Sequence, residues 1–319
     1  MNPLSGIYGA ASALRNTMFD RGMLATRRLA QPVISVGNLS AGGSGKTPFV
    51  IALGELLKAR DIRFDVLSRG YRRKSRGVLV VDANGKAVDF GDEPLMIARR
   101  LGVPVIVGES RYEAGRVAEQ KFNTQLHILD DGFQHRALAR DFDIVLMTAR
   151  DFEDGLLPLG RLREPLSALA RADAVVLPAD LAVDHPVLRG KAIWRFEREL
   201  VLRTLVSAPI VFCGIARPEQ FFAQVRAAGI MPAAEVEFRD HHHYERKDVQ
   251  QLLAMSAKLS AGGFVTTEKD AANLGSLQAD LEPLGIAELK VTLNDPDRSA
   301  GAILASTIFS RIAEQQPRS

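Results

Sequence analysis

The sequence has little cysteine and few aromatic residues, and it has no long apolar run. Cys213 is the single cysteine among 319 residues, so no internal disulfide can form and a reducing compartment is expected. Aromatic residues make up 6% of the chain, and we find no block of lysines and arginines of the kind that follows a nucleic-acid backbone, which argues against a nucleic-acid partner. No uncharged apolar stretch reaches the roughly 18 residues of a membrane-spanning helix. No feature indicates an obligate protein partner.

Acidic residues are scarce near the N-terminus, where Asp20 is the only one before Glu55. The basic residues of this region are Arg15, Arg21, Arg27, Arg28 and Lys46. This local excess of positive charge favours an anionic ligand or an anionic membrane surface. A basic start followed by an apolar core, which is typical of a secretory signal, is absent, so we expect a cytoplasmic protein.

A helical pattern extends over residues 3–29. Its apolar residues recur at steps of three and four and fall on one face: Leu4, Ile7, Ala11, Leu14, Met18, Ala25 and Leu29. The pattern fits two alternatives, a helix packed on the protein and an amphipathic helix at a membrane surface. Gly6, Gly9 and Gly22 weaken the helix prediction.

From Pro32 onward, apolar runs of strand length alternate with helical patterns. The expected strands are 33–36, 64–67, 78–81, 105–107, 126–129, 144–147 and 174–177, and the expected helices are 48–60, 93–101, 111–122 and 165–171. Continuous apolar strands that alternate with helices predict an α/β fold with a mostly parallel sheet covered on both faces.

Apolar and charged residues alternate over 191–203, a pattern typical of exposed extended chain. We therefore divide the sequence into an N-terminal amphipathic, membrane-associating helix (1–30), a nucleotide-binding domain (31–190), an extended connector (191–204) and a second, smaller α/β domain (205–319). In this last domain we expect strands 210–213, 235–238 and 264–266, helices 218–228 and 246–258, and a closing helix near 299–314.

The segment 33–57 has the order strand, glycine-rich turn, helix. The turn consists of Ser40, Ala41, Gly42, Gly43, Ser44, Gly45, Lys46 and Thr47. Glycines let backbone N–H groups point at phosphate oxygens, and the helix start adds partial positive charge. Lys46 is expected to reach the β- and γ-phosphates of ATP, and the Thr47 hydroxyl to bind Mg²⁺. The loop predicts a P-loop NTPase-like domain, although Ser40 stands where this motif usually has its first glycine.

A P-loop site also needs a carboxylate at the end of a neighbouring strand to hold the metal. The apolar run 126–129 ends in Asp130 and Asp131, which supply it. Adjacent strand residues point in opposite directions, so one is expected to bind Mg²⁺ directly and the other to act indirectly. Two acids at a strand end can also cap the following turn.

Seven motifs occur in an order that resembles one family. They are VGNLSAGGSGKTP (36–48), SRGY (68–71), GDEP (91–94), LDDGFQH (129–135), LPLGRLREP (157–165), RDHHHY (239–244) and TTEKDA (266–271). Together they are similar to the lipid A 4′-kinases, also called tetraacyldisaccharide 4′-kinases, over nearly the whole chain from Pro32 to about Asn273. Apart from the phosphate loop no single motif is diagnostic, but the ordered set is specific.

The resemblance implies ATP as donor and the 4′-hydroxyl of a tetraacylated glucosamine disaccharide 1-phosphate as acceptor, in lipid A biosynthesis. It also implies a peripheral enzyme on the cytoplasmic face of the bacterial inner membrane. By the same resemblance, Asp92 is the candidate base and His241 its partner. On the residues alone, an Asp-Glu-Pro triplet is also a common helix start. The triple histidine lacks zinc-like spacing, and an exposed polar turn accounts for His242 and His243.

Further candidates for binding the acceptor or a phosphate lie on loops predicted at the site. They are Asn38, Arg69, Arg111, Gln134, Arg163 and Glu164. Arginine side chains suit this task because they form paired, charge-assisted hydrogen bonds to phosphate. The roles of Lys269 and Asp270 stay open between supporting the nucleotide or domain closure and capping a helix.

Three other functions share parts of this pattern. A GTPase would use the same phosphate loop, but in TEKD Lys269 directly precedes Asp270, which is the wrong spacing for guanine recognition. A soluble P-loop small-molecule kinase would not need an amphipathic N-terminal helix. A non-enzymatic membrane adaptor would have no use for carboxylates at a strand end.

Overall fold

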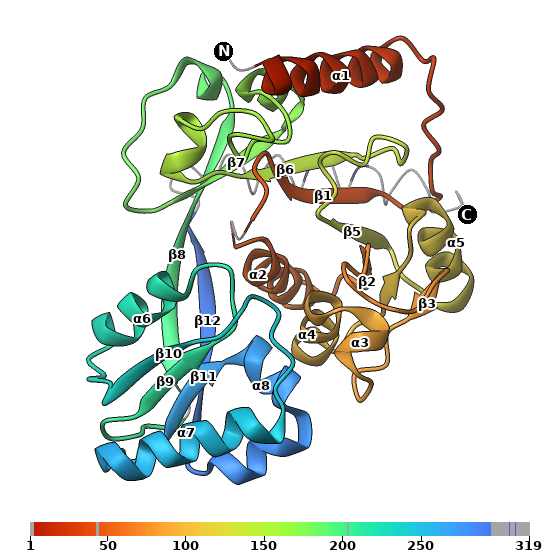
Figure 1. Cartoon of the computed structure of the whole chain (residues 1–319). Helices are drawn as coiled ribbons and strands as arrows, with labels where there is room; N and C mark the ends of the chain where they lie inside the picture. The colour runs from red at the N-terminus through yellow and green to blue at the C-terminus, as the bar shows by residue number, and fades with distance from the viewer. Residues whose placement is uncertain (1–2, 43–44, 203, 295–305, 307–309, 311–319) are drawn as a thin grey trace. The chain divides into compact units, whose positions relative to one another are not determined.

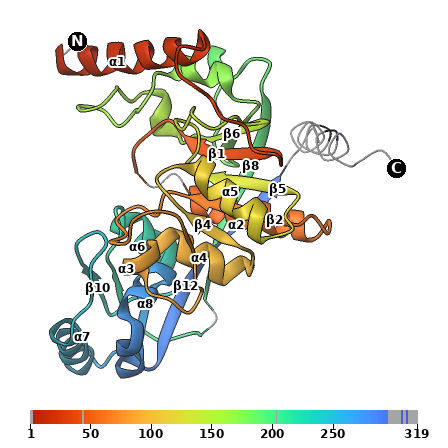
Figure 2. The same ribbon diagram turned by 90° about the vertical axis from the view of Figure 1, so that its right-hand side faces the viewer.

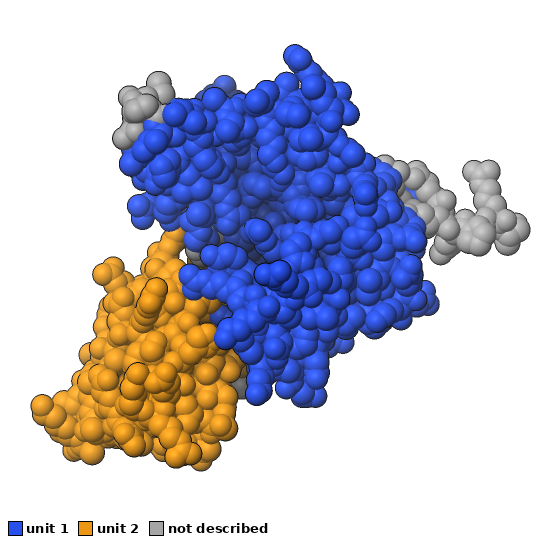
Figure 3. All heavy atoms as spheres, turned by 45° about the vertical axis from the view of Figure 1, so that its right-hand side comes forward, with its two compact units in different colours: residues 1–197, 291–319 blue, residues 198–290 orange. Residues whose placement is uncertain are grey.

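The structure is a computed structural model that describes residues 3–42, 45–202, 204–294, 306 and 310 (Figure 1). The chain forms two compact units, shown in different colours in Figure 3. Unit 1 comprises residues 1–197 and 291–319, and unit 2 comprises residues 198–290. The chain enters unit 2 along β8 (Ala192–Leu202) and leaves it along β12 (Leu284–Asn294).

The sheet of unit 1 is mostly parallel, as the sequence predicts. Its remaining strands are β1 (Val33–Asn38), β2 (Phe64–Ser68), β3 (Leu79–Val80), β4 (Val105–Val107), β5 (Leu126–Asp130), β6 (Phe142–Leu146) and β7 (Ala174–Pro178). The strand order is β8-β7-β6-β1-β5-β2-β4-β3. Only β3, which is shorter than the expected strand 78–81, runs antiparallel to its neighbour among these described pairs.

Helices cover both faces of this sheet. Ile34 and Val36 of β1 face one side and pack in a core with α2 (Lys46–Lys58) and α4 (Asp92–Leu101). Val33 faces the other side, where α5 (Arg111–Lys121) packs. The 3₁₀ helix η2 (Leu166–Arg171), expected as an α-helix, covers the same side. The short elements α3 (Ala87–Phe90), η1 (Ala149–Phe152) and η3 (Pro186–Leu188) complete unit 1.

The segment expected as a connector is a strand of the sheet. Residues 192–196 of β8 pair in parallel with Ala174–Pro178 of β7. Trp194 and Phe196 point into the core, while the alternate Ile193 and Arg195 are half-buried. The alternating pattern therefore comes from two faces that are buried to different degrees.

The N-terminal helix α1 (Pro3–Asp20) is shorter than the predicted helix over 3–29. Gly22 has a φ of 68° in the turn that ends it. The chain beyond is extended, because Arg27 exchanges backbone hydrogen bonds with Ala137 and Ala139. Leu29 continues the apolar spacing of the sequence but lies in the core beside α5. Turn geometry and sheet-side packing thus override the helical period.

The face of α1 that contacts the protein is polar. Ser5 Oγ donates to Leu156 O at 3.1 Å, Tyr8 Oη donates to Arg163 O at 3.1 Å, and Asn16 Nδ2 donates to Glu164 Oε2 at 2.8 Å. Figures 1 and 2 both show α1 lying along the loops around residues 150–170. The apolar stripe lies on another side: the exposed fractions of Leu4, Ile7 and Leu14 are 58%, 67% and 63%.

Unit 2 is a smaller parallel α/β unit. Its strands β9 (Ile210–Cys213), β10 (Ala234–Glu237), β11 (Phe264–Thr267) and the first part of β12 have the order β10-β9-β11-β12. Its helices are α6 (Pro218–Ala227), α7 (Arg246–Leu259), α8 (Glu268–Leu274) and the 3₁₀ helix η4 (Gly275–Leu281). The closing helix expected near 299–314 lies outside the described residues.

Strand β12 is absent from the sequence predictions. Its residues LGIAELKVTLN mix buried and exposed positions without a continuous apolar run. No helix in the described ranges combines the length and hydropathy that crossing a bilayer requires.

Candidate active site

The phosphate loop joins the fully buried strand β1 to helix α2, which begins at Lys46. Gly42 and Gly45 have φ angles of 110° and 86°, in the region that side chains with a Cβ disfavour. At these two positions the turn therefore requires glycine. Gly43 and Ser44, both predicted to bind the nucleotide, lie outside the described residues.

Ser40 replaces the usual first glycine because the chain there is held by a neighbouring segment. It forms an antiparallel bridge with Leu162 and is 3% exposed, and the next residue, Ala41, donates its N–H to Arg161 O at 2.7 Å. Ser40 is not among the residues with a positive φ, so a glycine is not required.

The Lys46 ammonium lies between Asn38, at the end of β1, and Asp131, which directly follows β5. Its Nζ is 3.1 Å from Asn38 Oδ1 and 3.4 Å from Asp131 Oδ1. Asn38 is the last residue of β1 and is fully buried. The side chain of Asn38, predicted to bind the acceptor, thus contacts the loop lysine.

A chain of hydrogen bonds connects Asp131 to three other predicted site residues. The Asp131 carboxylate accepts from Arg163 Nη1 at 3.0 Å, and Gln134 Oε1 is 3.4 Å from the same nitrogen. Gln134 Nε2 in turn donates to Asn38 O at 3.0 Å. Burial opposes ionisation of Asp131, but Lys46 and Arg163 outweigh it and lower the pKa of this carboxyl. Asp131 is therefore an anion held by two cations.

Asp130, at the end of β5, has a different environment. It is 1% exposed, its Oδ2 accepts from Ser68 Oγ at 3.0 Å, and its Oδ1 has no hydrogen-bond partner. Burial and the carboxylates of Glu93 and Asp131 raise its pKa to about 7. A buried carboxylate oxygen without a partner fits a divalent cation, which would offset the cost of the buried charge. Sequence reasoning missed Ser68, although SRGY includes it.

Both predicted metal carboxylates lie beside the phosphate loop. Strand β5 pairs in parallel with β1, and Val36 is opposite Asp130. Because the carboxyl ends of parallel strands share one edge, the loop after β1 and the two aspartates meet there. Thr47, the second residue of α2, is 6% exposed at the same edge.

A positively charged region surrounds Arg111, the first residue of α5. Arg111 is 6% exposed, its Nη1 donates to Glu109 O at 3.1 Å, and its Nε has no hydrogen-bond partner. Burial and the nearby Arg69 lower the pKa of its guanidinium. Burial, Arg111 and other arginines lower the pKa of His135 to about 4, so its imidazole is neutral at pH 7. His135 lies in LDDGFQH, but sequence reasoning gave it no role.

Glu164 lies beneath α1. It is 2% exposed, and its Oε2 accepts from Asn16 Nδ2 at 2.8 Å and from Arg171 Nη2 at 2.7 Å. In this structure Glu164, which is predicted to bind the acceptor, links α1 to η2.

The predicted base and its partner belong to different units. Asp92 is the first residue of α4, after Gly91 with a φ of 92°, so the helix-start interpretation of GDEP also holds. His241 lies in unit 2 with a φ of 58°, in the loop between β10 and α7. His242 does not merely lie in an exposed turn: its ring stacks on Phe238 at 4.8 Å, and its Nε2 is 2.9 Å from Asp248 Oδ2.

Asp270 lies in the first turn of α8, and the residue that caps this helix is Thr267. The N–H of Asp270 donates to the Thr267 hydroxyl at the start of α8, and its side chain is fully buried within unit 2. It is therefore not placed to read a nucleotide base, as the GTPase alternative would require.

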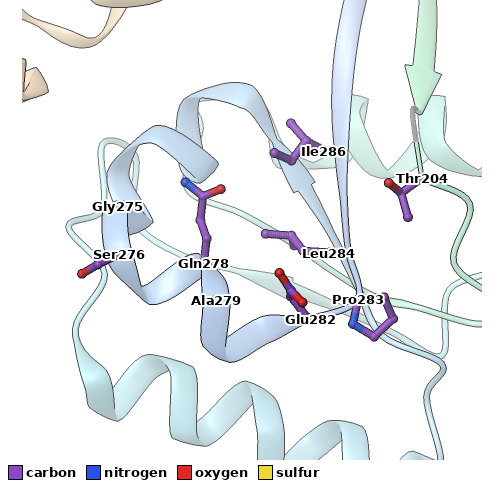
Figure 4. A pocket seen from close by; sticks show the side chains of 9 residues that line it. All are labelled: Thr204, Gly275, Ser276, Gln278, Ala279, Glu282, Pro283, Leu284 and Ile286. Carbon is purple, nitrogen blue, oxygen red and sulfur yellow. The ribbon is translucent and has the colours of Figure 1, made fainter. Parts of the chain in front are cut away.

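A cavity of about 610 Å³ also lies in unit 2 (Figure 4). Thr204, Gln278, Glu282 and Leu284 are among its lining residues, and no predicted site residue lines it.

The geometry at the end of β1 defines a class of protein. A lysine that begins a helix, glycines that turn the preceding loop and a buried aspartate on the adjacent parallel strand are how P-loop proteins bind nucleotide phosphates and their metal. Unit 1 is thus a P-loop nucleotide-binding unit. The model of the tetraacyldisaccharide-1-P 4′-kinase family (LpxK) matches residues 1–308, and the chain belongs to this family.

Relatives and a solved structure agree with this assignment. The chain is 48% identical to a tetraacyldisaccharide 4′-kinase of Koribacter versatilis over 95% of its own length and 98% of the relative's. It is 41% identical to the enzyme of Aquifex aeolicus over 76% and 82% of the two chains. A crystal structure of LpxK from Aquifex aeolicus in complex with ATP superposes with a TM-score of 0.80 at 34% identity, covering 97% of this chain and 98% of that one.

Proposed function

We propose that this protein transfers the γ-phosphate of ATP to the 4′-hydroxyl of a tetraacylated glucosamine disaccharide 1-phosphate, a step of lipid A biosynthesis. Family membership supports the reaction. The observation that carries the donor side is the position of Lys46 between Asn38 and Asp131, next to the partnerless oxygen of Asp130. ATP is the donor and Mg²⁺ its cation, and lipid binding distinguishes this function from that of a soluble small-molecule kinase.

In this proposal Asp130 and Thr47 hold Mg²⁺. The ion supplies charge neutralisation on the phosphates when it is bound. Asp131 keeps Lys46 and Arg163 in place through its two cationic contacts, and Ser68 fixes the orientation of the Asp130 carboxylate. Asn38 orients Lys46 by accepting a hydrogen bond from its ammonium group. The loop lysine is thereby aimed before the nucleotide arrives, which lowers the reorganisation needed in the transition state.

Asp92 is proposed as the general base that accepts the proton of the 4′-hydroxyl. His241 is proposed to assist it by orienting or receiving that proton. Asp92 belongs to unit 1 and His241 to unit 2. The start of α4 favours a negative charge at Asp92, and the anion is the form that a general base needs.

Arg111 and Arg69 are proposed to bind a phosphate group of the substrates. The support is the buried guanidinium of Arg111, whose Nε lacks a partner. An anion would provide that partner and relieve the repulsion between the two arginines. Gln134 and Glu164 are proposed to act indirectly. Gln134 contacts Arg163, and Glu164 accepts a hydrogen bond from Asn16 of α1.

We further propose that α1 lies on the cytoplasmic face of the inner membrane. The support is the orientation of this helix. Its polar side forms hydrogen bonds to the rest of unit 1, whereas Leu4, Ile7 and Leu14 are exposed on another side. Exposed apolar residues in a regular stripe mark a binding surface. An interfacial helix buries such a stripe among lipid acyl chains, which is also where an acylated substrate resides.

Replacing Ile7 with aspartate is expected to lower partitioning onto anionic phospholipid vesicles by roughly tenfold or more. The substitution removes an aliphatic side chain that the proposal places among the lipid acyl chains, and it adds a negative charge. Vesicle co-sedimentation of the purified protein measures this effect. Affinity for ATP should not change, since Ile7 is 67% exposed on α1.

Met231→Asp is the matched control for Ile7→Asp. Met231 is 73% exposed and lies in unit 2, away from α1 in the chain. Equal loss of vesicle binding in both variants, or no loss in Ile7→Asp, would refute a membrane role for the helix.

The proposed reaction is tested by incubating the protein with [γ-³²P]ATP, Mg²⁺ and the tetraacyl disaccharide 1-phosphate in detergent micelles. A labelled lipid whose phosphate maps to the 4′ position is the expected product. Label transfer only to a water-soluble acceptor, or only to water, would contradict the proposal.

A further inference from the structure

We infer that Asp270 is a positioning residue that holds the loop bearing His241, and that the Tyr244 hydroxyl is one of its points of attachment. The inference rests on the proposed role of His241 and concerns contacts within unit 2. Asp270 is fully buried, so it acts through its neighbours and not on a substrate.

His241 has a backbone conformation that needs support. Its φ of 58° is uncommon for a residue with a Cβ, and such conformations persist only where the surroundings fix them. The main support is a hydrogen bond in which His241 N–H donates to Gly214 O at 3.0 Å. Gly214 directly follows strand β9, so the loop is attached to the end of the sheet.

The other side of Gly214 is attached to Asp270. Gly214 N–H donates to Asp270 Oδ1 at 2.9 Å, so this glycine is bound by the aspartate at its nitrogen and by His241 at its oxygen. The approach is close: a Cβ on Gly214 would lie 3.1 Å from Asp270 Oδ1 and 3.0 Å from Arg239 O. A shift of the Asp270 carboxylate therefore moves the group that holds His241.

The same carboxylate oxygen also holds the far end of the loop. Tyr244 Oη donates to Asp270 Oδ1 at 2.9 Å, three residues after His241. The tyrosine ring is fixed separately by Phe212 and Phe238, whose ring centroids lie 5.7 Å and 5.1 Å away. Removing only the hydroxyl thus leaves the ring packed and releases one end of the loop.

Residues at the start of α8 orient the Asp270 carboxylate. Thr267 Oγ1 donates to the second oxygen of Asp270, which fixes the carboxylate. The neighbouring Lys269 reaches the same loop, with Nζ 3.3 Å from Asp240 Oδ1. Asp240 Oδ2 lies 3.8 Å from His241 Nε2, so Lys269 and Asp270 together support both the ring and the backbone of His241.

Tyr244→Phe is expected to lower kcat roughly tenfold and to leave KM for ATP unchanged, because displacing a catalytic group by a fraction of an ångström is costly whereas the nucleotide site lies in unit 1. Asp270→Ala should lower kcat by on the order of 10²-fold, and Asp270→Asn, which keeps an acceptor oxygen, should largely retain it.

Combination with His241→Ala separates positioning from general stability. If Tyr244 acts through His241, adding Tyr244→Phe to His241→Ala should change kcat by less than about twofold. Thr266→Val is the matched control, because it also removes a buried hydroxyl of unit 2, one that donates to Phe212 O at 2.8 Å, and it should not change kcat.

An equal kcat loss for Tyr244→Phe in both backgrounds, an equal loss for Thr266→Val, or no loss at all overturns the inference. If His241→Ala alone leaves kcat unchanged, the role proposed for His241 fails and this inference fails with it. The kinase reaction itself is judged separately, by the labelled-lipid product.

Discussion

Lys46→Ala is expected to reduce phosphoryl transfer by at least roughly 10²–10³-fold, the range found when one fixed charge or donor is removed from a transition-state site. The Lys46 ammonium is the only described cation within 4 Å of Asp131 apart from Arg163. Without it the γ-phosphate loses its main positive contact from the loop. Initial rates with saturating ATP and lipid acceptor measure the loss.

Lys58→Ala is the control for this variant. Lys58 ends the same helix, α2, and its Nζ donates to Leu101 O at 2.8 Å. It should lose some thermal stability and keep its turnover. Turnover of Lys46→Ala close to that of Lys58→Ala would show that the loop is not the phosphate site.

Asp92→Asn is expected to lower kcat by on the order of 10²–10⁴, the usual contribution of a general base. Asparagine preserves the size of the side chain but cannot accept the proton of the sugar hydroxyl. KM for ATP should change little, because Asp92 lies at the start of α4, whereas the phosphate loop leads into a different helix, α2. Single-turnover kinetics with labelled ATP separate this chemical step from binding.

Removing an acid from a helix start also weakens the helix, so a matched control is needed. Glu113 occupies the first turn of α5 and pairs with Arg27 at 3.1 Å. Glu113→Gln should have a similar small effect on stability and none on kcat. A loss below tenfold in Asp92→Asn would remove Asp92 from the role of base.

The sheet of unit 1 could be predicted because its strands are buried on both faces. Val33, Ile34, Val66 and Ile128 belong to continuous apolar runs, and such runs are rare outside central parallel strands. The phosphate loop could be predicted because its conformation demands glycine at Gly42 and Gly45. Both features are local, so the residues at each position carry the signal.

The elements that failed depend on distant neighbours. Leu29 keeps the spacing of the first helix, yet it packs beneath α5, and β8 alternates like exposed chain although it pairs with β7. Nothing in the local pattern of Leu284–Asn294 indicates that it forms a strand between β11 and β8. Tertiary pairing overrides local propensity in all three cases.

The candidate site shows the same division. The residue types at Lys46 and Asp130 follow from the chemistry of nucleotide binding, so the sequence could nominate them. Asn38 and Glu164 were chosen for polarity near the site, but one contacts Lys46 and the other contacts Asn16 of α1. Ser68, His135 and Tyr244 lie within the quoted motifs but were given no role, because their importance comes from partners that are 26 to 62 residues away or from several arginines at once.

The return of the chain along β12 affects the order in which the protein is completed during synthesis. Val291 packs in the same core as Trp194 and Phe196, although the whole of unit 2 (198–290) separates it in sequence from the end of the first segment of unit 1 at residue 197. While the ribosome makes unit 2, strand β8 lacks its neighbour on that side and is an open sheet edge. Open edges recruit other strands, so we expect the interval before Val291 emerges to be one in which a nascent chain is open to misassembly.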